Sequence, residues 1–180
     1  MLFRSRAVHK TITRVKSGRT RKDRGGVIWH TQGSGKSLTM VFLALKIRRD
    51  PKLSAFKLVI VTDRTQLDLQ ITNTFKNCLD ESVYSAKSIK YFKELLQRDT
   101  SDIITGMIQK FQENEIETFE ELNPSEKIIV LVDEGHRTQY GTLGVNLNIA
   151  LPNAAKIAFT GTPLIKSQKT TNEFGSYIDT

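Results

Sequence analysis

Cysteine is nearly absent from this sequence, and long apolar runs are missing altogether. Cys78 is the one cysteine among 180 residues, so no disulfide can form within the chain. No run approaches the roughly 20 apolar residues that cross a bilayer, and no apolar signal segment follows the basic N-terminus. These absences argue against a disulfide-stabilised secreted protein and against a membrane partner, and we expect a cytoplasmic protein.

The positive charge is concentrated at the N-terminus. Residues 1–24 hold nine Lys and Arg residues and one Asp, which accounts for the whole formal net charge of +8. Such a segment can neutralise nucleic-acid phosphates, or it can be a solvated arm or surface helix that binds nothing. Ala7, Val8, Ile12 and Val15 follow near-helical spacing, which predicts a basic helix over 1–16 before a charged loop.

A glycine-rich stretch follows the first short apolar run. Residues 30–37 read H-T-Q-G-S-G-K-S, which matches the phosphate-loop pattern G-x-x-x-x-G-K-[ST] at every fixed position except His30. Lys36 is expected to reach nucleotide phosphates, and the Ser37 hydroxyl is expected to ligate Mg²⁺. The nucleotide-binding set predicted from this loop is Thr31, Gln32, Gly33, Ser34, Gly35, Lys36 and Ser37. The alternative is a glycine-rich connector with an exposed lysine.

Strands alternate with helices along the rest of the chain. Strands are expected near 26–29, 58–62, 83–85, 103–105, 128–132 and 157–160, and helices from the phosphate loop to before Pro51 and at 65–75, 89–97 and 143–150. The first of these helices is expected to bury Leu38, Val41, Phe42 and Leu45. Residues 164–180 are polar and are expected to form a linker. The alternation predicts an α/β fold with a mainly parallel central sheet and helices on both faces.

Acidic residues follow the most apolar strand directly. Asp133, Glu134 and His136 come immediately after residues 128–132, and the carboxyl ends of parallel strands are where open α/β sheets bind ligands. In a phosphate-loop ATPase such an aspartate holds Mg²⁺, and a second acid polarises the attacking water. Asp133 and Glu134 fit these two roles, and His136 is a candidate for hydrogen bonding a neighbouring element. The alternative is a strand that simply ends in solvent.

Hydroxyl and basic side chains stand at the other predicted strand ends. Thr160 and Thr162 are candidates for relaying the nucleotide state, although a simple turn explains them equally well. Arg64 and Thr105 are candidates for contacting a nucleic-acid backbone, because such contacts commonly use Arg and hydroxyl groups. Arg64 fits equally well as the partner of a neighbouring surface aspartate.

Taken together, these blocks resemble the motor core of the R (restriction) subunit of type I restriction-modification enzymes. More widely, they resemble the first RecA-like lobe of superfamily 2 helicases and translocases. The resemblance is carried by residues 29–37, by 62–64 with Leu67 and Gln70, by Thr105 with 109–111, by 133–141 and by 159–163. The Trp-His-Thr-Gln lead-in and the Arg-Thr-Gln-Tyr-Gly after the acidic box point to the R subunits in particular, in which a histidine at the first glycine position is usual.

The resemblance implies a three-layer RecA-like P-loop NTPase lobe that uses ATP and Mg²⁺. Its catalytic residues would be Lys36, Asp133, Glu134 and His136, its metal ligands Ser37 and Asp133, its DNA contacts Arg64 and Thr105, and its coupling residues Thr160 and Thr162. The intact protein would use ATP hydrolysis to pull double-stranded DNA before a nuclease domain outside this chain cleaves it. Methylase and specificity subunits would bind through regions outside this chain.

The resemblance also implies domain boundaries, and two residues of this chain differ from the family pattern. We expect a basic helix and loop over 1–25, the motor lobe over 26–163, and a linker over 164–180 toward a second lobe. Gly135 replaces the usual alanine of the acidic box, and Arg4 stands near the position of the adenine-reading glutamine. Since the second lobe supplies a catalytic arginine, the isolated lobe should be weakly active or inactive. The alternatives are a non-catalytic nucleotide- or DNA-binding fragment and the first lobe of another superfamily 2 helicase or remodeller.

Overall fold

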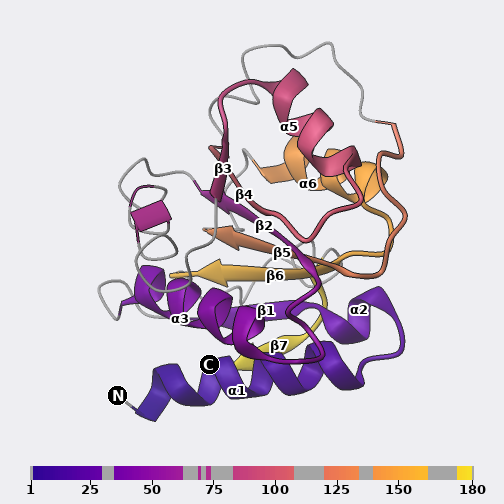
Figure 1. Ribbon diagram of the computed structural model, residues 1–180. Helices are drawn as coiled ribbons and strands as arrows, with labels where there is room; N and C mark the ends of the chain where they lie inside the picture. Colours follow the sequence, from indigo (N-terminus) through magenta and orange to yellow (C-terminus); the bar gives the residue numbers. More distant parts are fainter. Residues whose placement is uncertain are drawn as a thin grey trace.

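The protein folds around one parallel sheet, shown in Figure 1. The computed structural model describes residues 2–29, 35–62, 69, 72–73, 83–107, 120–133, 140–161 and 174–179. The strands are β1 (Gly26–Trp29), β2 (Lys57–Thr62), β3 (Val83–Ala86), β4 (Ile103–Met107), β5 (Ile128–Asp133), β6 (Ala155–Thr160) and β7 (Tyr177–Asp179). They lie in the order β3-β4-β2-β5-β6-β1-β7, and every neighbouring pair is parallel.

Helices cover both faces of this sheet. They are α1 (Leu2–Ser17), α2 (Arg21–Arg24), α3 (Lys36–Arg49), α5 (Ile89–Gln97) and α6 (Tyr140–Ala150). One apolar core joins α1 and α3 to one face of the sheet, and a second joins α5 and α6 to the other face. The predicted three-layer α/β architecture is therefore confirmed. No helix in the described ranges is long and apolar enough to cross a bilayer.

Strands β2, β5 and β6 occur where apolar runs predicted them, because a strand buried on both faces needs mostly apolar residues. Every residue of β2, β5 and β6 is buried. Helix α5 also buries the predicted face, which comprises Ile89, Phe92, Leu95 and Leu96. Of the helix expected over 65–75, residues 69 and 72–73 are described and are helical, and the rest of it lies outside the described residues.

The prediction for α3 was right about the helix and only partly right about its buried face. The helix ends at Arg49, before Pro51 as predicted. Of the four residues predicted to be buried, Val41 is buried and Leu45 is half-buried against the core, but Leu38 is 42% exposed and Phe42 is 47% exposed. The helix instead buries Met40, Leu43, Ala44 and Ile47 against the sheet and α1. Both sets follow i, i+3, i+4, i+7 spacing, so periodicity alone could not choose between them.

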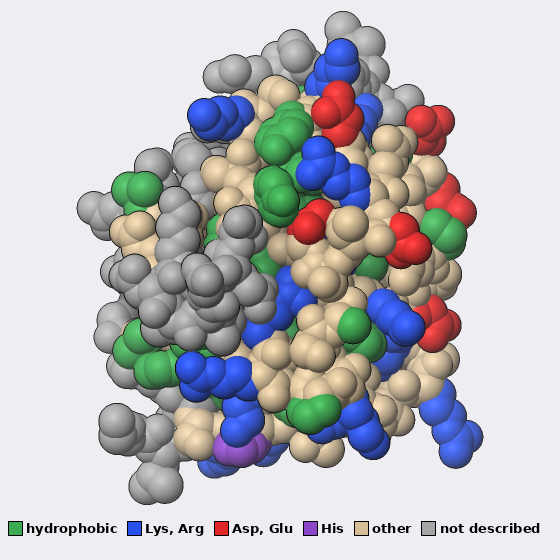
Figure 2. All heavy atoms as spheres, viewed as in Figure 1, with side chains coloured by type: hydrophobic (Ala, Val, Ile, Leu, Met, Phe, Trp, Pro, Cys, Tyr) green, Lys and Arg blue, Asp and Glu red, His purple; other side chains and the backbone are tan. Residues whose placement is uncertain are grey.

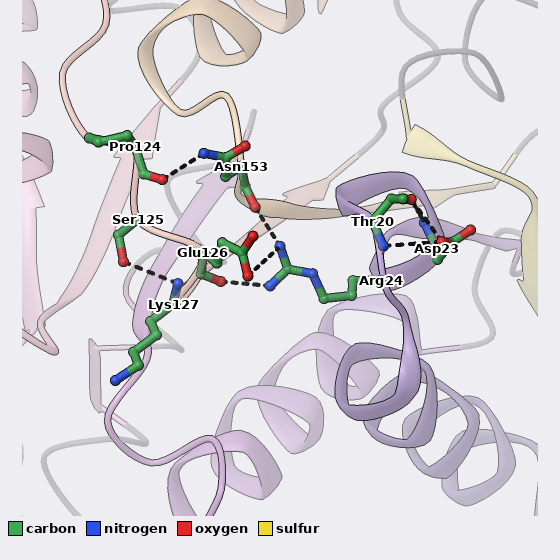
Figure 3. Close-up of polar contacts among 8 residues, drawn as sticks. All are labelled: Thr20, Asp23, Arg24, Pro124, Ser125, Glu126, Lys127 and Asn153. Carbon is green, nitrogen blue, oxygen red and sulfur yellow. Dashed lines mark hydrogen bonds and ion pairs between the residues drawn. The ribbon is translucent and has the colours of Figure 1, made fainter.

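The expected loop between the first helix and β1 contains the short helix α2. Its capping box pairs the Thr20 side chain with the backbone N–H of Asp23, and the Asp23 carboxylate with the backbone N–H of Thr20. The guanidinium of Arg24 is buried, and it donates to the carbonyls of Glu126 and Asn153 at 2.8 Å each (Figure 3). Arg24 thereby ties this segment to the loops that precede β5 and β6.

Strand β7 was not predicted, since residues 164–180 were expected to form a linker. Gly25 and Gly26 let the chain around β7 approach closely, because a Cβ on Gly26 would lie 2.5 Å from Cγ1 of Ile178. The buried carboxylate of Asp179 accepts hydrogen bonds from Arg6 Nε at 3.2 Å and Lys10 Nζ at 2.8 Å. The division at residues 25/26 and 163/164 stays a prediction, but α1 and β7 both pack into the lobe.

Candidate nucleotide-binding site

The carboxyl ends of three neighbouring strands form the candidate site. Strand β6 lies between β5 and β1 in the sheet. Trp29 at the end of β1 is in register with Thr160, and Asp133 at the end of β5 is in register with Phe159. The phosphate loop and the acidic box therefore leave the sheet from the same edge. Ligands of open parallel sheets bind at this edge.

Gly35 sets the start of the helix that follows the phosphate loop. It is the N-cap of α3, and its φ of 85° and ψ of 36° lie in the left-handed region that glycine adopts without strain. The first intrahelical bond runs from the backbone N–H of Thr39 to the carbonyl of Gly35 at 3.0 Å. The N–H groups of the first turn, which includes Lys36 and Ser37, have no acceptor within the helix. This helix end therefore suits an anion.

An ion pair joins the two motifs. Lys36 Nζ lies 2.9 Å from Oδ1 of Asp133, with 14% and 1% of the two side chains exposed. The sequence predicted that both groups serve one ligand, and the sheet brings them into contact. In chemical terms the pair places a cation and a carboxylate at the start of a helix. The ammonium suits a phosphate oxygen and the carboxylate suits a divalent cation, so these residues fit a metal–nucleotide ligand.

The remaining predicted residues in the described part of the chain are two buried threonines. Thr160 is fully buried at the end of β6, in register with Trp29 of β1. It therefore lies between the strand that leads to the phosphate loop and the strand that ends at Asp133. Its coupling role stays a prediction. Thr105 is also fully buried, and its hydroxyl has no hydrogen-bond partner in the described residues. In this conformation it offers no surface to a DNA backbone, so the predicted DNA contact would need the side chain to become accessible.

Several predicted site residues lie outside the described residues. They are Thr31, Gln32, Gly33, Ser34, Arg64, Glu134, His136 and Thr162. For Ser37 the structure gives the helical backbone and nothing of the side chain. The roles of these residues stay predictions. Within the described ranges, no three His, Cys, Asp or Glu side chains come together as a metal-binding group.

Sequence reasoning missed the buried cations of the fold. Lys57 Nζ donates to the carbonyls of Leu95 and Arg98 at 2.6 and 2.5 Å, which caps the end of α5. Burial lowers the pKa of Lys57. Lys156 Nζ donates to the carbonyl of Leu151 at 2.8 Å, and burial lowers the pKa of Lys156 to about 7. The sequence signal for such a buried cation was a lysine at the beginning of an apolar strand. Lys57 and Lys156 both have a structural role.

The basic N-terminal segment forms the predicted helix, and several of its cations have partners within the fold. Arg6 and Lys10 bind Asp179, Arg14 donates to Ser176 Oγ at 2.7 Å, and Arg24 is buried. Burial raises the pKa of Asp179, but the hydrogen bonds from Lys10 and Arg6 outweigh it and hold the pKa below its ordinary value. Several of these cations therefore help to hold the fold together, although Arg6 and Lys10 remain half exposed. Nucleic-acid binding by this segment stays a prediction.

Comparison with known proteins places this chain in a family. The SWI2/SNF2 ATPase family model matches residues 4–180. The chain is 42% identical over 176 residues to the putative type I restriction enzyme MjaIXP endonuclease subunit of Methanocaldococcus jannaschii, covering 96% of this chain and 17% of that protein. It is 40% identical over 171 residues to the HindI endonuclease subunit of Haemophilus influenzae, covering 85% of this chain and 16% of that one. The chain thus spans about one sixth of these curated relatives.

Solved structures share the fold at lower identity. The type ISP restriction-modification enzyme LlaGI, determined with a DNA substrate mimic, aligns with a TM-score of 0.59 and 17% identity over 98% of this chain and 16% of that one. The Pyrococcus furiosus Hef helicase domain aligns with a TM-score of 0.57 and 16% identity over 96% of this chain and 38% of that one. The predicted RecA-like fold and the resemblance to restriction R subunits are both confirmed. By the match over residues 4–180, the chain belongs to the SWI2/SNF2 ATPase family.

Proposed function

We propose that this chain is the ATP-binding motor lobe of a type I restriction endonuclease R subunit. In the intact protein it would contribute to the ATP hydrolysis that drives duplex DNA translocation. The observation that carries the proposal is the contact between Lys36 and Asp133 at the carboxyl edge of the sheet. A simple glycine-rich connector would not require a lysine at the first turn of α3 to meet a buried aspartate from another strand.

The chain's own residues divide the work of binding. Gly35, Lys36 and the N–H groups of the first turn of α3 would hold the phosphates, and Asp133 with Ser37 would hold Mg²⁺. ATP supplies the phosphoryl group whose transfer to water drives the motor. Glu134 would accept a proton from that water, and the low exposure of Asp133 keeps bulk solvent away from the metal position.

The remaining roles extend beyond this site. Thr160, Thr162 and His136 would couple the nucleotide state to motion, and Arg64 would contact DNA. Cleavage, together with docking on methylase and specificity subunits, would belong to other regions of the full-length protein, because this chain spans 17% of a 42% identical relative. Because the intact protein would act on cellular DNA, it would work in the cytoplasm.

Two alternative functions remain to be distinguished by experiment. Another superfamily 2 helicase would share the fold, since the Hef and LlaGI structures align almost equally well. Identities of 42% and 40% to restriction subunits, against 16% to Hef, favour the restriction assignment. A non-catalytic binding fragment would bind nucleotide without DNA-stimulated hydrolysis in any longer form of the protein.

The test is DNA-stimulated ATPase activity in a full-length protein that contains this lobe. We expect Lys36→Ala and Glu134→Gln to reduce the rate by about a hundredfold or more, since each removes a group acting on the transferring phosphoryl group or its water. Lys52→Ala, an exposed lysine beyond the end of α3, is the matched control and should retain the wild-type rate. Equal rates in all four proteins would overturn the site assignment.

A further inference from the structure

A groove between α1 and α3 is not used by the proposed site. It has a volume of about 400 Å³, and Val8 of α1 with Leu38, Phe42 and Leu45 of α3 form its apolar floor. Lys46 and Arg49 line the same groove. Figure 2 shows hydrophobic side chains beside Lys and Arg side chains at the lower left, over these two helices. We call this feature the α1–α3 groove.

The apolar floor exists because α3 carries two apolar faces. One face is buried against the sheet and α1, and the second is partly open: Val41 on it is buried, but Leu38 is 42% and Phe42 47% exposed. Single exposed apolar residues are ordinary on protein surfaces, but neighbouring ones at i and i+4 that line a groove indicate an interaction site. Spacing of this kind fits a helix laid into a groove.

The positive charge of Lys46 and Arg49 at the rim of the groove indicates which kind of molecule can bind there. Lys46 and Arg49 are exposed, and neither has an ion pair or hydrogen bond within the described part of the chain. A second copy would bring equal charges together and carries the same net charge of +8, which opposes self-association. Duplex DNA would satisfy the two cations but would leave the apolar floor without a partner. An acidic partner with an apolar stripe satisfies both features.

We propose that the α1–α3 groove docks an amphipathic helix whose apolar stripe is flanked by Asp or Glu side chains. The groove lies on the helix that begins with Lys36, so its occupant sits against the element that presents the phosphate loop. The curated relatives are about six times longer than the matched region. This length supplies ample sequence for such a helix within the longer proteins. The proposal does not depend on ATP turnover.

Fluorescence anisotropy with two synthetic helical peptides tests the groove on the 180-residue chain. Each peptide has about five turns and leucines at i, i+3, i+4 and i+7; one carries Glu beside the stripe and the other carries Lys. We expect the Glu peptide to bind about tenfold more tightly or better. Phe42→Ser should weaken binding of the Glu peptide about tenfold, whereas Val145→Ser, an exposed apolar residue on α6, should leave it unchanged.

Charge reversal provides the second arm. The Lys46→Glu/Arg49→Glu variant should prefer the Lys peptide, and Lys90→Glu on α5, an exposed control, should keep the wild-type preference. Circular dichroism confirms that each variant is folded. The proposal is overturned if neither peptide binds, if both bind equally, or if Phe42→Ser binds like wild type. It is also overturned if Phe42→Ser instead abolishes duplex DNA binding, or abolishes a dimer seen by sedimentation.

Discussion

Lys36 and Asp133 belong to motifs far apart in the sequence, yet Lys36 Nζ lies 2.9 Å from Oδ1 of Asp133. The contact follows from the sheet order, because β6 is the one strand that separates β1 from β5. The ends of β1 and β5 therefore lie one strand apart, and Lys36 at the start of α3 reaches Asp133. With only 1% of the Asp133 side chain exposed, this ion pair should also contribute to stability.

Removing the ammonium should therefore destabilise the fold as well as the site. We expect Lys36→Met to lower the free energy of unfolding by about 1–3 kcal/mol, because the buried Asp133 carboxylate loses a charged neighbour. Urea denaturation of the 180-residue chain measures this loss. Lys36→Met/Asp133→Asn should recover part of it. Lys46→Met, on the exposed side of the same helix, should change stability by less than about 0.5 kcal/mol, and an equal loss there would contradict the role of the pair.

Lys156 should make stability depend on alkaline pH. Its pKa is about 7 in the folded chain and 10.5 ordinarily, so between these values the unfolded state binds one more proton. The free energy of unfolding should therefore rise as the pH increases from about 7 to about 10. Lys156→Met should remove most of this dependence, since the buried Lys57 also has a lowered pKa, and should stabilise the protein by roughly 3–5 kcal/mol near pH 6, with a smaller gain at pH 10. Denaturant titrations across this range measure both effects.

An exposed lysine supplies the matched control for this pH dependence. Lys127→Met changes the same type of side chain at an exposed position just before β5. Its pH profile should follow that of the wild type. A flat wild-type profile between pH 7 and pH 10 would contradict the assignment of the shifted group.

Two arginines of the N-terminal segment should differ sharply although each substitution removes one positive charge. Arg24 is buried and donates to the carbonyls of Glu126 and Asn153 (Figure 3), whereas Arg19 is exposed. Arg24→Met should cost about 2–4 kcal/mol, since it leaves both carbonyls without their donor. Arg19→Met should cost less than about 0.5 kcal/mol. Thermal and urea unfolding of the pair measure the difference, and equal losses would indicate a general effect of charge.

The close approach at Gly26 should make this position intolerant of any side chain. A Cβ there would lie 2.5 Å from Cγ1 of Ile178 and 2.7 Å from the carbonyl oxygen of Ser176. We expect Gly26→Ala to destabilise the chain by about 1–3 kcal/mol and to increase hydrogen exchange in β7. Gly26→Ala/Ile178→Ala should recover part of the loss, because it removes one of the two clashes. Unchanged exchange in β7 would show that the strand accommodates the methyl group.

Much of the fold was predictable because its central strands are mostly apolar and its motifs stand where those strands end. The runs at 58–62 and 128–132 left little choice but buried parallel strands, and the site pair Lys36 and Asp133 followed from their positions at strand ends. Glycines and acids that follow a strand directly can be recognised in the sequence without knowing how the strands pack.

The failures have physical causes that a single sequence does not contain. Helix α3 carries two apolar faces with the same spacing, and its packing against the sheet and α1 decides which is buried. Strand β7 has three residues, too few for a period, and its place depends on long-range contacts of Asp179 with Arg6 and Lys10. Thr105 was placed at a strand end by its motif, yet burial in β4 depends on the strands at either side.

Strand β7 also covers the backbone edge of β1 and so protects the sheet from pairing with another chain. Without residues 174–179, β1 would present an unpaired backbone edge beside the apolar side chains of Val27 and Ile28, which is a template for pairing with another chain. The present edge is only three residues long and has the charged groups of Asp179, Arg6 and Lys10 against it, and short, charged edges resist such pairing. A version of the chain that stops at residue 173 should therefore aggregate through the strand that carries the phosphate loop.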